Sequence, residues 1–208
     1  MSRSVHKSGT APGNRLPHRV RIVGGRWRGR KLEFPAIDAI RPSPDRVRET
    51  LFNWLQHEIV GTRCLDLFAG SGALGFEALS RGAAHVTFVD REPRIGRYLR
   101  ETLQRLQCMD AAVVVADALS YLNGQREGWD IVFLDPPFAS DLLKKSVALL
   151  QTGWLKPNAW VYIECDSTNA LSLPPHWSLH RSSRAGQVGY HLIRVTADAA
   201  SHVISRNL

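Results

Sequence analysis

The chain has 208 residues, of which 44% are apolar, which is enough for one well-packed α/β domain with a small appendage. No apolar run approaches the roughly 20 residues of a membrane span and the N-terminus has no hydrophobic signal core, so we expect a soluble, cytoplasmic protein. Its three cysteines, Cys64, Cys108 and Cys165, are far apart and lack paired spacing, which argues against a disulfide framework, a zinc site or an iron–sulfur cluster.

The net charge of +8 is concentrated at one end of the chain. Residues 1–48 contain 12 Lys/Arg against 3 Asp/Glu, whereas residues 49–208 contain 15 against 16. A basic segment on a near-neutral body is typical of a polyanion-binding appendage, for which nucleic acid is the first candidate and an anionic membrane the second. A solvated basic tail without a specific partner is the simpler alternative.

The N-terminal quarter of the chain contains two different segments. Residues 1–18 mix small, polar and basic residues without periodicity, so we expect a disordered basic tail. Residues 19–40 predict a basic β-hairpin, because basic and apolar side chains alternate on either side of a glycine-containing turn. The turn presents Arg26, Trp27 and Arg28, which suit an RNA grip through phosphate pairing and base stacking. A tryptophan that packs on the main domain is the alternative.

The next segment, residues 41–196, is predicted to form one α/β domain. Prolines end the hairpin segment, and apolar residues spaced by three and four predict a helix over residues 45–59. Beyond it, apolar strands alternate with helices, which is the pattern of a doubly wound sheet buried on both faces. We expect strands near residues 63–67, 85–90, 111–116, 130–134 and 159–165, and helices near residues 72–81, 92–107 and 141–151.

The end of the chain departs from this alternation. Residues 177–184 and 188–195 predict two strands joined by a tight turn, hence an antiparallel pair. Residues 197–208 are expected to form a frayed C-terminal tail.

A glycine-rich loop follows the first strand of the domain. Gly70, Gly72 and Gly75 match the G-x-G-x-x-G fingerprint of dinucleotide-binding loops, and Asp90 ends the second strand where an acid can accept ribose hydroxyls. This pattern alone does not choose between NAD and another adenosyl ligand. Asp66, at the end of the first strand, would repel a pyrophosphate but attract an ammonium group.

A third carboxylate, Asp117, follows the next strand and can accept a hydrogen bond from an adenine amino group. S-adenosylmethionine is the ligand that uses all three acids: Asp66 for its amino-acid end, Asp90 for its ribose and Asp117 for its adenine. We therefore predict S-adenosylmethionine as the cofactor, with Arg91 and Ala118 beside these acids also contributing to its site. Helix-capping or turn-forming roles for Asp66 and Asp117 are the alternative.

The segment Asp135-Pro136-Pro137-Phe138 follows a buried strand and joins an acid, two rigid prolines and an aromatic ring. The prolines remove two backbone donors, so nearby carbonyl groups are free to accept from a ligand. An amino group on a flat heterocycle can donate to Asp135 and to a carbonyl around Pro136 while Phe138 stacks on the ring. We predict Asp135, Pro136 and Phe138 as catalytic residues. In an ordinary strand-ending turn, Phe138 would only fill a gap.

Four segments together resemble the RsmD family of 16S ribosomal RNA guanine-N2 methyltransferases, within the class I S-adenosylmethionine-dependent superfamily. Residues 21–32 and 41–55 point to this family, whereas residues 66–75 and 135–138 are shared by many methyltransferases. The resemblance implies a seven-stranded, Rossmann-like sheet with an antiparallel last strand. It also implies methylation of the exocyclic amino group of one guanine in small-subunit ribosomal RNA.

The resemblance also indicates a partner and a binding surface. The substrate would be 16S ribosomal RNA within an assembled or assembling small subunit, and the enzyme a monomer with no membrane partner and no metal. The hairpin would hold the RNA through Arg21, Arg26, Trp27, Arg28, Arg30 and Lys31.

Three other functions stay open at this level. Methylation of DNA adenine or of a protein glutamine also suits this kind of loop, although those enzymes more often carry Asn where this chain has Asp135. A non-catalytic RNA-binding or assembly factor would need only the hairpin. A nicotinamide-dependent oxidoreductase explains the glycines and Asp90 but gives residues 135–138 no task.

Overall fold

The computed structural model describes residues 18–35, 43–138, 140–169 and 171–196. These residues form a seven-stranded sheet and a separate two-stranded hairpin. The predicted C-terminal tail, nearly all of the N-terminal tail, and Arg41 and Pro42 lie outside the described residues. The strands of the large sheet are β3 (Arg63–Asp66), β4 (His85–Asp90), β5 (Ala111–Val115), β6 (Trp129–Leu134), β7 (Leu155–Asp166), β8 (Trp177–Ala185) and β9 (Val188–Val195).

The strand order is β5-β4-β3-β6-β7-β9-β8. The first five strands in this order are mutually parallel, and β9 runs antiparallel to both of its neighbours. The predicted mostly parallel sheet with an antiparallel last strand is therefore confirmed. The chain crosses from β4 and β5 on one side of β3 to β6 on the other, so the carboxyl end of β3 is the topological switch point where such sheets bind ligands.

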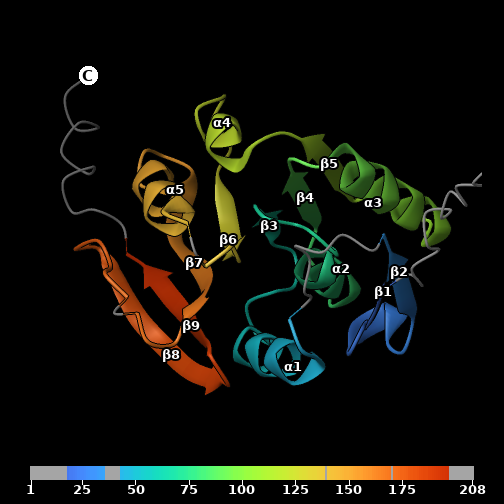
Figure 1. Cartoon of the computed structure of the whole chain (residues 1–208), viewed down its shortest axis with the longest axis horizontal. Helices are drawn as coiled ribbons and strands as arrows, with labels where there is room; N and C mark the ends of the chain where they lie inside the picture. Colours follow the sequence, from blue (N-terminus) through green and yellow to red (C-terminus); the bar gives the residue numbers. More distant parts are fainter. Residues whose placement is uncertain (1–17, 36–42, 139, 170, 197–208) are drawn as a thin grey trace, which may run out of the picture.

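Helices cover both faces of this sheet (Figure 1). One face packs against α1 (Asp45–Trp54), α2 (Ala73–Ser80) and α3 (Pro93–Arg105), and the other against α4 (Ala118–Leu122) and α5 (Leu142–Leu150). Side chains alternate across a strand, so Phe133 lies in the first core and its neighbour Val132 in the second. This explains why the strands read as continuous apolar runs. The three cysteines are buried free thiols.

Two elements differ from the prediction. The helix α1 ends at Trp54 instead of continuing to residue 59, and the turn after it lets Glu58 accept a hydrogen bond from the Trp160 indole at 3.1 Å. The short helix α4 was not expected, because five residues are too few to show helical periodicity. Among the described residues, no helix is long and apolar enough to cross a membrane.

The N-terminal hairpin pairs β1 (His18–Arg21) with β2 (Lys31–Phe34) in antiparallel register. Val20 and Leu32 face the protein core, whereas Arg19 and Lys31 are exposed, as the alternating pattern predicts. A short 3-10 turn, η1 (Gly25–Trp27), lies between the strands. The hairpin therefore adds its apolar face to the core on the side of α2 and α3.

The carboxylate of Glu77 on α2 holds this hairpin in place. It is fully buried and accepts hydrogen bonds from the backbone amides of Val23 at 2.8 Å and Gly24 at 2.7 Å. It also pairs with Arg81 at 2.7 Å and with Arg48 of α1 at 3.4 Å. One buried charge thus joins the hairpin, α1 and α2, and each partner compensates its desolvation.

We predict that Glu77→Ala strongly destabilises the protein, because it leaves the Val23 and Gly24 amides without their acceptor and removes one of the two carboxylates that pair with the buried Arg48. The expected loss is about 3–5 kcal/mol of unfolding free energy, measured by urea denaturation. As a control, Glu127→Ala removes an exposed ion pair with Arg63 and should cost less than about 1 kcal/mol. Equal losses in the two variants would contradict a central role for Glu77.

Candidate active site

Three carboxylates gather at the carboxyl ends of neighbouring strands. Asp66 ends β3, Asp135 follows β6, and Glu164 lies near the end of β7. Asp66 is paired with Phe133, and Phe133 with Tyr162, so the next same-face positions along β6 and β7 are Asp135 and Glu164. All three side chains consequently project from the face of the sheet that α1 and α2 cover.

This cluster is acidic and poorly solvated. Burial raises the pKa of Asp66 to about 7, although the Gly75 amide donates to its Oδ2 at 3.0 Å and lowers it. Burial, followed by the charges of Glu164 and Asp66, raises the pKa of Asp135 well above its ordinary value. Burial also raises the pKa of Glu164. Carboxylates in this condition gain from a cationic ligand, since it offsets both their desolvation and their mutual repulsion.

The glycine loop packs tightly against this edge. Gly72 has a φ of +72° at the start of α2, and a Cβ atom there would lie 2.5 Å from Phe76. A Cβ atom on Gly75 would lie 2.2 Å from Phe88 of β4, so only glycine lets α2 approach the sheet this closely. The Gly70 amide donates to Asp90 Oδ2 at 2.8 Å. The structure therefore brings the predicted loop and its two acids together.

Both of these acids also organise the loop. Asp66 accepts from Gly75, and Asp90 Oδ1 accepts from the Glu92 amide at 2.8 Å, so the turn-forming alternative describes part of what they do. A carboxylate has about four acceptor positions, and capacity remains on each group for a ligand.

The remaining predicted cofactor residues lie at the same edge. Asp117 caps α4, accepting from the amides of Leu119 and Ser120 at 3.0 Å each, as the helix-cap alternative predicts. Both bonds fall on Oδ1, and Oδ2 makes no hydrogen bond within the described part of the chain. Ala118 is buried at the start of α4, and Arg91 is exposed just after β4.

The Asp-Pro-Pro-Phe loop exposes the aromatic ring with which a flat substrate could stack. Asp135 is partly buried and Pro136 is buried, but Phe138 is 40% exposed, so its ring does not fill a core gap. The Pro137 carbonyl accepts from the Ser140 hydroxyl at 2.6 Å. The Pro136 carbonyl accepts no hydrogen bond from the described residues. The loop thus offers a carboxylate, a carbonyl and an aromatic face.

Sequence reasoning missed two groups next to this loop, Glu164 and Ser43. The Ser43 hydroxyl donates to Glu164 Oε1 at 2.6 Å, and the Tyr162 hydroxyl donates to the same oxygen at 2.9 Å. Arg48, 1% exposed, donates to the Ser43 carbonyl at 3.2 Å, so its guanidinium acts inside the protein and is not open to solvent. The sequence signal that could have identified Glu164 is a single acidic residue inside the apolar run 159–165.

Comparisons with known proteins show the family of this chain. The model of the family described as Conserved hypothetical protein 95 matches residues 20–194. The chain is 47% identical to ribosomal RNA small subunit methyltransferase D of Escherichia coli (strain K12) over 184 residues, which cover 88% of this chain and 93% of that protein. The Haemophilus influenzae protein of the same name is 44% identical over 178 residues, covering 83% and 92%. The chain belongs to the RsmD family.

A solved structure extends this likeness to the fold. The Escherichia coli protein yhhF matches with a TM-score of 0.79 and 46% sequence identity, covering 87% of this chain and 100% of that one. The family model, which matches residues 20–194, spans the hairpin as well as the sheet.

The prediction that Trp27 stacks on RNA needs correction. Its side chain is 7% exposed, its backbone amide donates to the Ser80 hydroxyl at 2.9 Å, and the Arg26 guanidinium lies 4.2 Å from the centre of its ring. Apolar burial against α2 and α3 outweighs exposure of the large ring to solvent. The alternative, a tryptophan that packs on the main domain, is the correct one.

The predicted basic residues of the hairpin fall into two groups. Arg21 pairs with Asp45 at 3.0 Å, and Arg26 lies 3.9 Å from Asp110. The other three are exposed and have no ion pair within the described residues: Arg28, Arg30 and Lys31. These three residues carry exposed positive charge on the hairpin.

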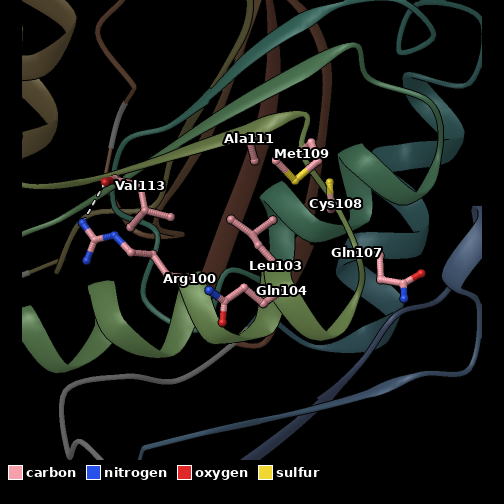
Figure 2. A pocket seen from close by; sticks show the side chains of 8 residues that line it. All are labelled: Arg100, Leu103, Gln104, Gln107, Cys108, Met109, Ala111 and Val113. Carbon is pink, nitrogen blue, oxygen red and sulfur yellow. Dashed lines mark hydrogen bonds between the residues drawn. The ribbon is translucent and has the colours of Figure 1, made fainter.

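A recess of about 670 Å³ lies away from this site, between α3 and the edge strand β5 (Figure 2). Leu103 and Val113 line it, and Arg100 closes one side by donating to the Val113 carbonyl at 2.9 Å. It opens on the outer edge of the sheet, three strands from β6. The recess is therefore separate from the ligand site proposed at the acidic cluster.

We predict that Asp66→Asn stabilises the unliganded protein at about pH 8. The pKa of Asp66 is about 7 in the folded protein against an ordinary 3.8. Its favourable contribution to the unfolding free energy is therefore fully present below about pH 4 and is lost as the pH rises through 7. Removing the ionisable group should raise the unfolding free energy by at least about 1 kcal/mol, or the Tm by about 2–4 °C.

The control for this prediction is Asp166→Asn. That carboxyl is exposed and its pKa is lowered by hydrogen bonds from Thr168, so neutralising it at the same pH should not raise the Tm. Differential scanning calorimetry of both variants at about pH 4 and pH 8 distinguishes the two. A pH-independent effect of Asp66→Asn would contradict the prediction.

Proposed function

We propose that this RsmD-family protein transfers the methyl group of S-adenosylmethionine to the exocyclic N2 amino group of a guanine in small-subunit ribosomal RNA. The observation that carries the proposal is the placement of Asp135 and an exposed Phe138 beside the acidic switch point of the sheet. The ribosomal RNA substrate is supported by the names of the relatives with 47% and 44% identity.

The acidic edge suits S-adenosylmethionine on chemical grounds. This ligand carries two positive charges, a sulfonium and an ammonium, and has no pyrophosphate for Asp66 to repel. When bound, it supplies an activated methyl group. Asp66 would hold the ammonium group, Asp90 the ribose and Asp117 the adenine, with Gly70 and Gly72 allowing close backbone approach. A nicotinamide dinucleotide would bring its pyrophosphate to the same acids.

The Asp-Pro-Pro-Phe loop would position the guanine. The exocyclic amino group of guanine is a poor nucleophile because its lone pair is delocalised into the ring, so catalysis depends mainly on geometry. The amino group would donate one hydrogen bond to Asp135 and the other to the Pro136 carbonyl. Together these two hydrogen bonds would direct the nitrogen lone pair at the methyl group. Alignment of this kind supplies on the order of 7–11 kcal/mol. Stacking on Phe138 adds about 1–3 kcal/mol of binding.

The proposal extends to the partner and its setting. Residues 19–40 would be the RNA-holding extension, residues 41–196 the methyltransferase domain, and Arg28, Arg30 and Lys31 the phosphate contacts. We propose that the protein acts in the cytoplasm as a monomer, on RNA within the small subunit or an assembly intermediate. Incubation with tritiated S-adenosylmethionine and naked 16S RNA, small subunits or DNA, followed by nucleoside identification, tests the whole proposal. Label in N6-methyladenine would reject it.

We predict that Asp135→Asn lowers the rate of methyl transfer at least about 100-fold, since an amide accepts no proton from the reacting amino group. S-adenosylmethionine should still bind with an affinity reduced no more than about tenfold, because the proposed contacts of Asp66, Asp90 and Asp117 remain, and isothermal titration calorimetry measures this. Asp141→Asn alters an exposed acid paired with Lys145 and serves as the control of unchanged turnover. Near wild-type turnover in Asp135→Asn would refute the catalytic assignment.

We predict that replacing Arg28, Arg30 and Lys31 by Gln weakens RNA binding at low salt and reduces the salt dependence of binding. Loss of three phosphate contacts lowers the slope of log K against log[salt] by about 2–3. Arg97, Lys144 and Lys145, replaced in the same way, provide a control with an equal change in charge on α3 and α5. The two triple variants should differ clearly, and equal effects would show that only net charge matters.

A further inference from the structure

The proposed chemistry leaves one buried ionisable group next to the catalytic loop without a role. Glu164 is 3% exposed, belongs to β7, and occupies the position beside Asp135 on the same face of the sheet. Its Oε1 atom accepts from two hydroxyl groups, Ser43 at 2.6 Å and Tyr162 at 2.9 Å. Two donors converging on one carboxylate oxygen favour its ionised form.

The origin of the Ser43 contact is unusual. Ser43 lies before α1, 121 residues from Glu164 in sequence, and the buried Arg48 guanidinium holds its backbone carbonyl at 3.2 Å. Arg48 is itself paired with Glu77 at 3.4 Å, so the position of Ser43 is set by the same contacts that dock the hairpin. A serine that only capped α1 would not need to reach the far end of β7; α1 receives no side-chain cap.

The charges that face Asp135 are all acidic. Glu164 on β7 and Asp66 on β3 both raise its pKa, after burial. Burial raises the pKa of Tyr162 on β7 well above its ordinary value, so this phenol is uncharged at ordinary pH. The buried cation of α1, Arg48, is engaged by Asp45, Glu77 and the Ser43 carbonyl. A carboxylate with anionic neighbours and little solvent holds a proton more tightly than an exposed one.

We propose that Glu164 is a positioning residue for Asp135: Ser43 and Tyr162 keep it anionic, and its charge makes Asp135 a stronger acceptor for the proton released by methyl transfer. This inference rests on the proposed function. In the transfer, the N2 nitrogen forms a bond to the methyl carbon, and the sulfur–methyl electron pair stays on sulfur, which becomes a neutral thioether. The nitrogen then gives one proton to an Asp135 oxygen, and that proton passes to solvent.

The first experiment needs no substrate. The carboxyl titration of Asp135 is followed by NMR in unliganded protein labelled with ¹³C at the aspartate carboxyl carbon, and the resonance is assigned by its loss in Asp135→Asn. In Glu164→Gln, which keeps an oxygen for both hydroxyl donors, the midpoint should fall by about one pH unit or more. Ser43→Ala should shift it in the same direction, because Glu164 then takes up a proton more easily. An unchanged midpoint in both variants overturns the proposal.

The second experiment separates this role from a merely structural one. Single-turnover methyl transfer is measured against pH at saturating S-adenosylmethionine. In Glu164→Gln the acidic limb should move to lower pH by a similar amount, and the plateau rate should fall about tenfold because Asp135 has become a weaker base. A structural defect would lower the rate by the same factor at every pH and leave the limb in place, which would also overturn the proposal.

A matched variant controls for the loss of a buried hydroxyl. Ser146 on α5 is as buried as Ser43, and its hydroxyl has no hydrogen-bond partner among the described residues. Ser146→Ala should leave both the Asp135 midpoint and the pH–rate profile unchanged. If Glu164→Gln does not fold, the variants Ser43→Ala and Tyr162→Phe test the proposal in its place. Each should lower the titration midpoint of Asp135. If the wild type methylates no guanine, the proposed function fails, while the titration still tests the Glu164–Asp135 pair.

Discussion

The buried carboxylate of Glu77 is the contact on which the arrangement of this molecule depends. A carboxylate without exposure to solvent costs several kcal/mol unless donors surround it, and the donors here come from three separate elements. The hairpin supplies two backbone amides, α1 supplies Arg48, and the residue that caps the end of α2 is Arg81. Folding α2 onto the sheet therefore requires that the hairpin and α1 dock with it. Since α2 begins at the glycine loop, the surface proposed for RNA and the site proposed for the cofactor are built on one helix.

The same contacts continue toward the proposed catalytic loop. Arg48 links Glu77 to the Ser43 carbonyl, and the Ser43 hydroxyl reaches Glu164, which lies beside Asp135. Hydrogen bonds and ion pairs thus connect the hairpin to β7 through the core between α1 and the sheet. This gives residues 43–48 a physical task beyond forming a helix start. They connect the hairpin to the end of β7, two parts of the structure that are far apart in the sequence.

The acidic edge of the sheet carries a cost that a ligand would remove. Burial and mutual repulsion raise the pKa values of Asp66, Asp135 and Glu164, which means that the unliganded protein holds these groups at some expense of stability near neutral pH. Sites often show this conflict between stability and function. A cationic ligand relieves it, and the relief contributes to binding.

Most strands and helices followed from sequence because they depend on local or periodic signals, whereas the roles of the site residues stay predictions. Apolar runs predicted the strands, glycine spacing predicted the loop, and the alternation of basic and apolar residues predicted the hairpin. Helix α4 was not predicted because a helix of five residues is too short to show helical periodicity. Helix α1 ends at Trp54, and the turn that follows it places Glu58 at the Trp160 indole. The exposure of the hairpin's basic side chains followed from the alternation of basic and apolar residues. The predicted RNA-binding residues Arg28, Arg30 and Lys31 therefore stay a prediction.

Other properties depended on partners far away in the chain. Trp27 was equally suited to stacking on RNA or packing, and only docking on α2 and α3 decided that it is buried. Asp117 could be identified as an acid at a strand end, but its capping of α4 needed the backbone. The sequence by itself determined which residue types stand at the ends of the strands. The tertiary structure alone decided that Glu164, Ser43 and Asp135 meet, because strand register and the Glu77 contacts bring together residues separated by up to 121 positions.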